Sequence, residues 1–240
     1  MKTIVIVQAR MGSTRLPGKV LKQLGNSNTL TYVLERCKKI EGVSEVIVAT
    51  SDLNKDDVIS KWCEKNGIAC FRGSENNVLD RYIKAAMNYE PDYIIRVTAD
   101  CPFVDYHMAS EMVRKIEKNQ VDIFDLKGEL PRGLAPEIIS FNALEYIQKN
   151  GKENRHKEHV TYYAYENKSE FKRSDFEVSE YKNRPSLRVT LDTLEDYEVL
   201  NKIALNFDDL LVPSEDVIKY LLENPEIARI NAHIEQKKVK

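Results

Sequence analysis

The sequence predicts an α/β protein with three layers, α/β/α, built around a mostly parallel mixed sheet of the Rossmann-like kind. In the first half of the chain, short apolar segments alternate with amphipathic ones in the order β-α-β-α-β-α-β-α-β, which is typical of parallel sheets with right-handed crossovers. The first segment, residues 3–7, has four Ile or Val in five positions. It is apolar on both faces, as central parallel strands are.

The length of 240 residues fits one large domain with a substantial core. We expect a single domain over residues 1–240, with a smaller portion around residues 127–186. That portion begins with the segment KGELPRGLAP, whose glycines and prolines predict a loop.

The remaining elements of the first half follow from hydrophobic period and turn residues. Asn28 or Thr29 can cap a helix, Gly42 can stop it, and Gly67 is a good left-handed stop for the next helix. The predicted strands are 46–49, 68–71, 92–98 and 121–126, and the predicted helices are 29–40, 56–66, 77–89 and 106–119.

The second half is predicted to contain helix 141–149 and then strands 176–178 and 187–191. No full helix separates these two strands, so one member of the pair should be antiparallel. Thr193 and Asp196 resemble a capping box for helix 194–205. Helices 214–222 and 225–236 follow, and KKVK forms a polar tail.

Charge and composition exclude several classes of function. The chain has 36 basic and 38 acidic residues and a net charge of −2, so its overall charge offers no case for binding nucleic acid. No apolar run approaches the roughly 18 residues of a membrane span, and the N-terminus lacks the pattern of a signal peptide. We therefore expect a cytoplasmic protein without a membrane partner.

The loop after the first strand is predicted to hold a polyphosphate. Glycines and hydroxyls let backbone N–H groups approach phosphate oxygens between cationic side chains. A Walker A motif is excluded because five residues separate the glycines and Val20 replaces the magnesium-binding hydroxyl. An ordinary turn with solvated cations stays an alternative. The candidate residues are Arg10, Gly12, Ser13, Thr14, Arg15, Gly18 and Lys19.

Two aspartates are candidates for holding a divalent cation. Asp100 follows predicted strand 92–98 and Asp192 follows predicted strand 187–191, so both should lie at the same edge of the sheet. Carboxylate oxygens suit Mg²⁺, and nucleotide phosphates would fill its other positions. The alternatives are a turn aspartate that bonds its own backbone for Asp100 and a helix-start carboxylate for Asp192.

Five segments together resemble a known family along nearly the whole chain. They are ARMGSTRLPGK at 9–19, FRGSENNVLDRY at 71–82, RVTADCPFVD at 96–105, EHVTYY at 158–163 and RVTLDTLEDYE at 188–198. In this order they resemble the cytidylyltransferases that make CMP-activated sugars, the group of the CMP-Kdo and CMP-sialic acid synthetases. The resemblance is greatest to the SpsF branch of spore coat polysaccharide biosynthesis proteins.

The resemblance implies a nucleotide-diphospho-sugar transferase-like fold and assigns roles to residues. Catalysis would fall to Arg10, Arg15, Lys19, Asp100 and Asp192, with Mg²⁺ on the two aspartates. Nucleotide contacts would come from Ala9, Arg10, Gly12, Ser13, Arg15, Lys19, Ser51 and Arg72, with Asp80 and Arg81 beside the site. Acceptor contacts would come from Arg132, Glu137, His156 and His159; Gly133 and Glu137 fit the family outline, whereas Ala135 departs from it.

The expected function is a cytidylyltransferase that transfers CMP from CTP to an acidic or specialised sugar of a surface or spore-coat polysaccharide and releases pyrophosphate. A glycosyltransferase that uses a finished nucleotide sugar is an alternative, because fold does not decide chemistry. An inactive scaffold is a second alternative. The partners are then CTP and a sugar, without nucleic acid, and the resemblance implies a homodimer.

Overall fold

The computed structural model describes residues 1–235, and within them the main sheet has seven strands in the order β5-β4-β1-β6-β8-β7-β9. A separate two-stranded ribbon pairs β2 with β3. The strands are β1 (Thr3–Gln8), β2 (Gln23–Leu24), β3 (Ser27–Asn28), β4 (Val43–Ser51), β5 (Ala69–Gly73), β6 (Tyr93–Thr98), β7 (Ile123–Lys127), β8 (Glu137–Ser140) and β9 (Arg173–Glu177).

The sheet is mixed and mostly parallel, as the sequence predicts. β1 pairs in parallel with β4 and β6, β4 with β5, and β7 with β9. Only β8 runs against its neighbours, pairing antiparallel with both β6 and β7. The reversed strand therefore begins at the edge where the parallel strands end, and its first residue, Glu137, lies opposite Arg96.

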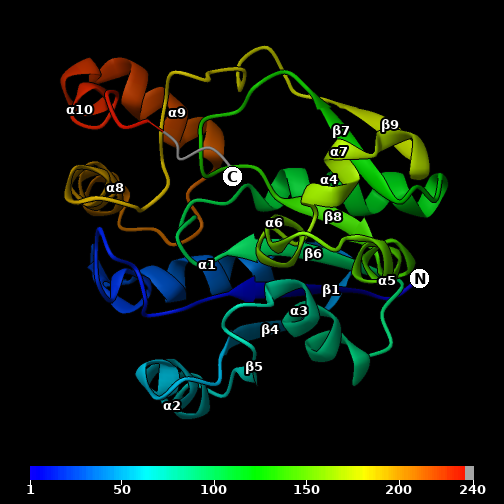
Figure 1. Cartoon of the computed structure of the whole chain (residues 1–240). Coiled ribbons are helices and arrows are strands. Elements are labelled where there is room, and N and C mark those ends of the chain that lie inside the picture. The colour runs from blue at the N-terminus through cyan, green and yellow to red at the C-terminus, as the bar shows by residue number, and fades with distance from the viewer. Residues whose placement is uncertain (236–240) are drawn as a thin grey trace.

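The helices cover both faces of the sheet, which confirms the predicted three layers (Figure 1). Side chains of α1, α2 and α4 pack on one face, and those of α3 and α5 pack on the other. The helices are α1 (Thr29–Lys38), α2 (Asp57–Lys65), α3 (Val78–Met87), α4 (Tyr106–Lys118), α5 (Phe141–Asn150), α6 (Asn154–Glu158), α7 (Tyr162–Glu166), α8 (Leu194–Phe207), α9 (Ser214–Glu223) and α10 (Pro225–Arg229).

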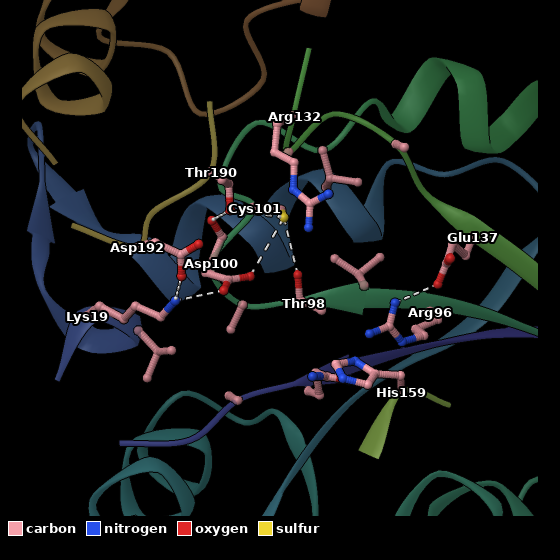
Figure 2. A pocket seen from close by; sticks show the side chains of 18 of the residues that line it. Lys19, Arg96, Thr98, Asp100, Cys101, Arg132, Glu137, His159, Thr190 and Asp192 are labelled. Carbon is pink, nitrogen blue, oxygen red and sulfur yellow. Dashed lines mark hydrogen bonds and ion pairs between the residues drawn. The ribbon is translucent and has the colours of Figure 1, made fainter. Parts of the chain in front are cut away.

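The carboxyl ends of the parallel strands meet along one edge of the sheet. β1 ends at Gln8 and β6 at Thr98, in register with each other. Ligand sites in such sheets lie outside the strand carboxyl ends, because the connecting loops diverge there. In this protein a large pocket opens at that edge (Figure 2).

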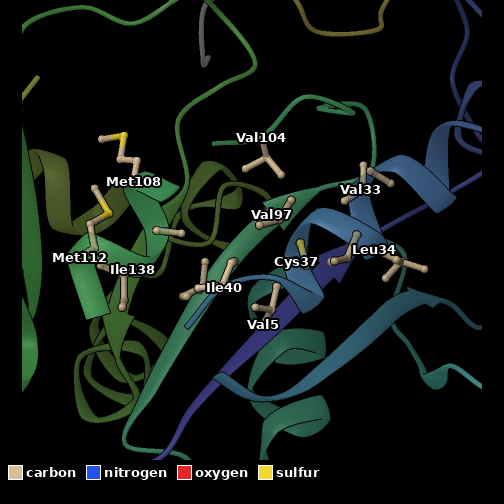
Figure 3. Packing of buried hydrophobic residues seen from close by; sticks show 14 of the residues in the cluster. Val5, Val33, Leu34, Cys37, Ile40, Val97, Val104, Met108, Met112 and Ile138 are labelled. Atoms are coloured by element: carbon tan, nitrogen blue, oxygen red, sulfur yellow. The ribbon is translucent and has the colours of Figure 1, made fainter. Parts of the chain in front are cut away.

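The central strand β1 divides the core between the two faces by strict alternation. Val5 and Val7 face α1 and α4, whereas Ile4 and Ile6 face α3 and α5, and all four are fully buried. Figure 3 shows side chains of α1 and α4 gathered over Val5 and the neighbouring β6. Burial of each such side chain contributes about 1.5–3 kcal/mol, so this sandwich is what holds the sheet edge rigid.

A third apolar cluster joins the C-terminal helices to the rest of the protein. α8 and α9 bury their apolar faces against Leu16, Phe103 and the extended segment 187–191. In Figure 1, α8, α9 and α10 form a group at one end of the sheet. Because Leu16 lies in the predicted phosphate loop, this cluster also anchors that loop.

Arg36 of α1 fastens the C-terminal group through main-chain carbonyls. Its side chain is fully buried, donating from Nε to the Val104 carbonyl at 2.9 Å and from Nη1 to the Val212 carbonyl at 2.8 Å. Burial lowers the pKa of Arg36 to about 10, because the charge has been taken out of water. The guanidinium is therefore a structural donor rather than a member of the pocket.

Three predictions for the second half need correction. Segment 187–191 forms no strand; it is extended and makes a single parallel bridge, from Arg188 to Arg132. The antiparallel member is β8, which was not predicted, whereas β9 is parallel to β7. The helix predicted at 225–236 ends at Arg229; Gln236 and the tail lie outside the described residues.

The capping box predicted at Thr193 and Asp196 is present, with both reciprocal hydrogen bonds.

Within residues 1–235, none of the helices combines the length and the apolar character that crossing a bilayer requires.

Replacing Arg36 by Met should lower the free energy of unfolding by about 3 kcal/mol, because buried carbonyls of two segments lose their donors. Lys38→Met is the matched control, since Lys38 makes only an exposed pair with Glu35 and should change stability by less than about 0.5 kcal/mol. Urea denaturation measures both. Equal losses for the two variants would contradict the role given to Arg36.

Candidate active site at the carboxyl edge of the sheet

The pocket at the sheet edge has a volume of about 980 Å³, enough for a nucleotide together with a second substrate. Five chain segments form its walls: the loop after β1, the start of α3, the loop around Arg132, the region of Glu158 and His159, and segment 185–192. The end of β6 with Thr98, Asp100 and Cys101 forms its floor. Segments far apart in the sequence therefore meet around one space.

The loop after β1 has the features of a phosphate cradle. Its backbone is held in place by Asp56, whose Oδ1 accepts from the Met11 N–H at 2.6 Å. Gly18 takes a left-handed conformation, φ 70°, and leads into a short 3-10 helix that begins at Lys19. Arg10 and Arg15 keep 49% and 34% of their side chains exposed, so both remain available to a ligand.

Lys19 joins the two predicted metal-binding aspartates. Its Nζ lies 2.7 Å from Asp100 Oδ2 and 2.8 Å from Asp192 Oδ1, and only 11% of its side chain is exposed (Figure 2). The three residues come from the first loop, the tip of β6 and the start of α8. The structure thus brings together Lys19, Asp100 and Asp192, which we call the Lys19 cluster.

The surroundings of Lys19 and of Asp192 shift the pKa of each group toward its charged form. Burial is the largest influence on Lys19 and acts to lower its pKa, but Asp100 and Asp192 outweigh it, so the pKa of Lys19 is raised. For Asp192, burial acts to raise the pKa, but the positive charges of Lys19, Arg15 and Arg188 outweigh burial, so the pKa of Asp192 is lowered. At neutral pH the Lys19 ammonium therefore lies against the Asp192 carboxylate.

Asp192 is held from behind by a second set of charges. Its Oδ2 accepts from Arg188 at 3.1 Å and lies 3.3 Å from Arg15. Arg188 in turn pairs with Asp196, at 2.8 Å from Nε to Oδ1, and Asp196 also accepts from the Asp192 N–H. Oδ1 of Asp192 consequently faces Lys19 and Asp100 in a defined orientation, although no strand carries this residue.

The segment before Asp192 is pressed against the loop at Arg132. The Arg132 N–H donates to Leu187 at 3.1 Å, and the Val189 N–H donates to Arg132 at 2.7 Å. Gly133 makes this approach possible: its φ is +105°, and a Cβ there would lie 2.7 Å from the Val189 carbonyl carbon. The Arg132 side chain is exposed at the mouth of the pocket.

The far wall of the pocket contains a half-buried charge pair, Arg96 and Glu137. Arg96 Nη1 lies 2.5 Å from Glu137 Oε2, and Tyr165 and Thr161 also donate to the Glu137 carboxylate, at 3.0 and 3.2 Å. Burial acts to lower the pKa of Arg96, but the negative charge of Glu137 outweighs burial, so the pKa of Arg96 is raised. Arg96 Nε is buried without a hydrogen-bond partner among the described residues. His159 lies beside this pair in Figure 2.

Most residues predicted for the site line this pocket. Of the nucleotide set, the structure places Ala9, Arg10, Gly12, Ser13, Arg15 and Lys19 there, and of the acceptor set Arg132, Glu137 and His159.

Three predicted residues lie elsewhere. Ser51 is buried and donates to Asp56, so it supports the loop after β1 through that carboxylate. Arg72 pairs with Asp57 at 2.7 Å and donates to the Ser51 carbonyl. His156 is buried against Glu166, at 2.7 Å, beside a separate small pocket.

Sequence reasoning missed Arg96 as a member of the pocket and treated Arg81 as a residue beside it. Arg96 sits inside a strand pattern, where a charged residue at an inward position was the available signal. Arg81 of α3 lines the pocket, is 2% exposed, and has a buried Nε without a partner among the described residues. Burial lowers the pKa of Arg81.

The donor set is compatible with a hard divalent cation that is shared with a nucleotide. Within residues 1–235, no group of three or more His, Cys, Asp or Glu side chains could hold a metal ion. Asp100 and Asp192 offer two carboxylates directed at one point, that of Lys19 Nζ. Mg²⁺ is commonly held by one or two carboxylates together with substrate phosphates and water, so these residues fit it.

A cationic loop and paired carboxylates at the carboxyl edge of a mostly parallel sheet are the features that a nucleotidyltransferase site would need, a polyphosphate-binding loop and carboxylates for Mg²⁺. The family model described as Cytidylyltransferase matches residues 4–227, nearly the whole of the chain. The chain belongs to the cytidylyltransferase family.

Individual relatives agree with this assignment. The chain is 40% identical over 237 residues to an uncharacterized protein of Methanocaldococcus jannaschii, covering 99% of this chain and 97% of that one. It is 34% identical over 231 residues to the spore coat polysaccharide biosynthesis protein SpsF of Bacillus subtilis, covering 94% and 96%. The solved structure of a cytidylyltransferase from Leptospira borgpetersenii superposes with a TM-score of 0.90 at 33% identity, covering 99% and 100%.

Replacing Gly133 by Ala should lower the free energy of unfolding by roughly 2–4 kcal/mol, because strain in the backbone adds to a clash with Val189. Gly67→Ala is the matched control: Gly67 also has a positive φ, +65°, but nothing lies within 4 Å of an added Cβ. The Gly67→Ala variant should lose only about 1 kcal/mol of its free energy of unfolding. Similar losses for both variants in urea denaturation would contradict the close approach at Gly133.

Proposed function

We propose that this protein transfers CMP from CTP to a sugar with release of pyrophosphate, in a reaction that depends on Mg²⁺. The observation that carries the proposal is the Lys19 cluster, which places two carboxylates and a lysine beside the loop of Arg10 and Arg15. Family membership supplies the nucleotide, because a cytidylyltransferase transfers a cytidylyl group.

The charges of the loop suit a triphosphate. Arg10 and Arg15 are exposed at the pocket and can offer forked donors to phosphate oxygens, while Lys19 offers a compact charge. Backbone N–H groups near Gly12 add neutral donors. In this arrangement the loop binds the triphosphate and later stabilises the leaving pyrophosphate.

The reaction joins the sugar hydroxyl to the α-phosphorus. A bond forms between that oxygen and phosphorus while the bond from the α-phosphorus to the oxygen bridging to the β-phosphorus breaks. The electron pair leaves with pyrophosphate, and the hydroxyl proton is released. Positioning and charge stabilisation account for most catalysis of this type. When bound by Asp100 and Asp192, Mg²⁺ would supply Lewis-acid polarisation of the phosphate.

The far wall suits the sugar. Arg132 at the mouth and Arg96 and His159 at the wall bring positive or hydrogen-bonding groups to the end of the pocket away from Lys19. Glu137 is already occupied by Arg96, Tyr165 and Thr161, so it orients Arg96 rather than presenting a free carboxylate. An acidic sugar therefore matches this end better than a neutral one. The homodimer that the resemblance implies and the cytoplasmic location expected from the sequence both stay predictions.

Thermal unfolding with CTP, UTP, GTP or ATP, each with and without Mg²⁺, tests the proposal. CTP with Mg²⁺ at about a hundred times its dissociation constant should stabilise the protein by about 2.7 kcal/mol, a rise in Tm of roughly 5–10 °C. Asp100→Asn should lose the Mg²⁺-dependent part of this rise. Asp175→Asn, at an exposed aspartate of β9, is the control. Equal shifts for all four nucleotides, or no shift, would exclude the proposed function.

Replacing Arg132 by Met should raise the KM for the sugar by about tenfold or more while CTP-induced stabilisation is unchanged, because Arg132 lies at the mouth of the pocket away from the phosphate loop. The measurement is pyrophosphate release with a panel of sugars that do and do not carry a carboxylate. Arg114→Met, an exposed arginine paired with Glu41, is the control. An unchanged KM would remove Arg132 from the acceptor site.

A further inference from the structure

Lys19 occupies the point at which a divalent cation would be held. Its Nζ lies at hydrogen-bond distance from one oxygen of each aspartate, 2.7 Å to Asp100 and 2.8 Å to Asp192. The ammonium is a single positive charge between two negative ones, and 11% of the Lys19 side chain is exposed. In the absence of a ligand the carboxylate pair is therefore already neutralised in large part.

A metal ion and this ammonium cannot share the two oxygens. Mg²⁺ binds oxygen at about 2.0–2.1 Å and demands a near-ideal octahedron, so it needs the side of each carboxylate that now faces Lys19. With Lys19 in place, an entering cation would lose solvation and meet a like charge at close range. Entry requires that Lys19 move away first.

A triphosphate bound to the loop after β1 would give Lys19 a second position for its charge. The residue begins the short 3-10 helix directly after Gly18, at the end of the loop that we assign to the triphosphate. A lysine has a flexible four-carbon stem, so its charge can shift by several ångströms without a change in the backbone. A triphosphate on the loop would offer new negative partners beside Arg10 and Arg15.

Asp192 is arranged to keep its orientation when Lys19 leaves. Its Oδ2 stays bonded to Arg188, and Arg188 is paired with Asp196, which is fully buried. Only Oδ1 is released. The departure of Lys19 thus uncovers a preformed metal ligand rather than a mobile side chain.

We propose that Lys19 is an internal cation that keeps divalent metal off Asp100 and Asp192 until a nucleoside triphosphate draws it away. The inference rests on the proposed function for the identity of the triggering ligand. Its consequence is mutual coupling: the triphosphate raises the affinity for metal, and by reciprocity the metal raises the affinity for the triphosphate. Lys19 then ensures that metal is held at the site only together with a substrate.

Binding of Mn²⁺ to the nucleotide-free protein tests this directly, with free Mn²⁺ measured by electron paramagnetic resonance. Wild-type protein should show no stoichiometric binding below about 1 mM, whereas Lys19→Met should bind one Mn²⁺ per chain about tenfold more tightly or better. The gain should vanish in the double variant Lys19→Met with Asp192→Asn. Lys55→Met is the control, because Lys55 lies at the loop but pairs with Glu75.

Lys19→Gln is the second variant should the methionine variant fold poorly, since glutamine can still donate a hydrogen bond to a carboxylate. It should also bind Mn²⁺ about tenfold more tightly than wild-type protein, whereas Lys19→Arg, which keeps the charge, should not. Unchanged Mn²⁺ affinity in both neutral variants, or tight binding by nucleotide-free wild-type protein, would overturn the inference. No nucleotide is present, so the result does not depend on whether CTP is the substrate.

Discussion

The contact of one ammonium group with two carboxylates organises the functional edge of this protein. In the sequence, 81 positions separate Lys19 from Asp100 and 173 separate it from Asp192. In the structure its ammonium nevertheless lies within hydrogen-bond distance of both carboxylates. Two half-buried carboxylates facing each other would repel, so the lysine is what allows them to share a site. The loop after β1, the end of β6 and the start of α8 are thereby tied to one point.

The sheet creates the conditions for that contact. Parallel strands direct β1 and β6 to the same edge, and Leu16 anchors the loop after β1 in the apolar cluster beneath α8 and α9. The reversed strand β8 starts at this edge, which is why Glu137 reaches Arg96 across the pocket wall. The architecture thus brings the end of the pocket that we propose for the triphosphate and the end that we propose for the sugar into a single space.

The sequence was sufficient for elements whose local pattern is strong. Buried β1, the cap at Asn28 and the box at Thr193 follow from residue types alone, and the structure confirms them. β8 was not predicted because it has only four residues and α5 begins immediately after it, with no turn residue between the two elements. Segment 187–191 has a strand-like pattern, but it is buried by the C-terminal helices rather than by sheet neighbours. Local period cannot distinguish these two kinds of burial.

Within the site, the sequence did not predict which residues that lie far apart along the chain contact one another. The sequence placed Asp100 and Asp192 at one edge but did not indicate that Lys19 lies between them. It also did not indicate that Ser51 bonds Asp56 and that Arg72 bonds the Ser51 carbonyl, outside the lining of the pocket. The most direct measurement is a crystal structure with CTP and Mg²⁺. The account predicts triphosphate on the loop, Mg²⁺ on both aspartates and Lys19 on phosphate. Nucleotide bound elsewhere, or Lys19 still between the aspartates beside bound CTP, would contradict it.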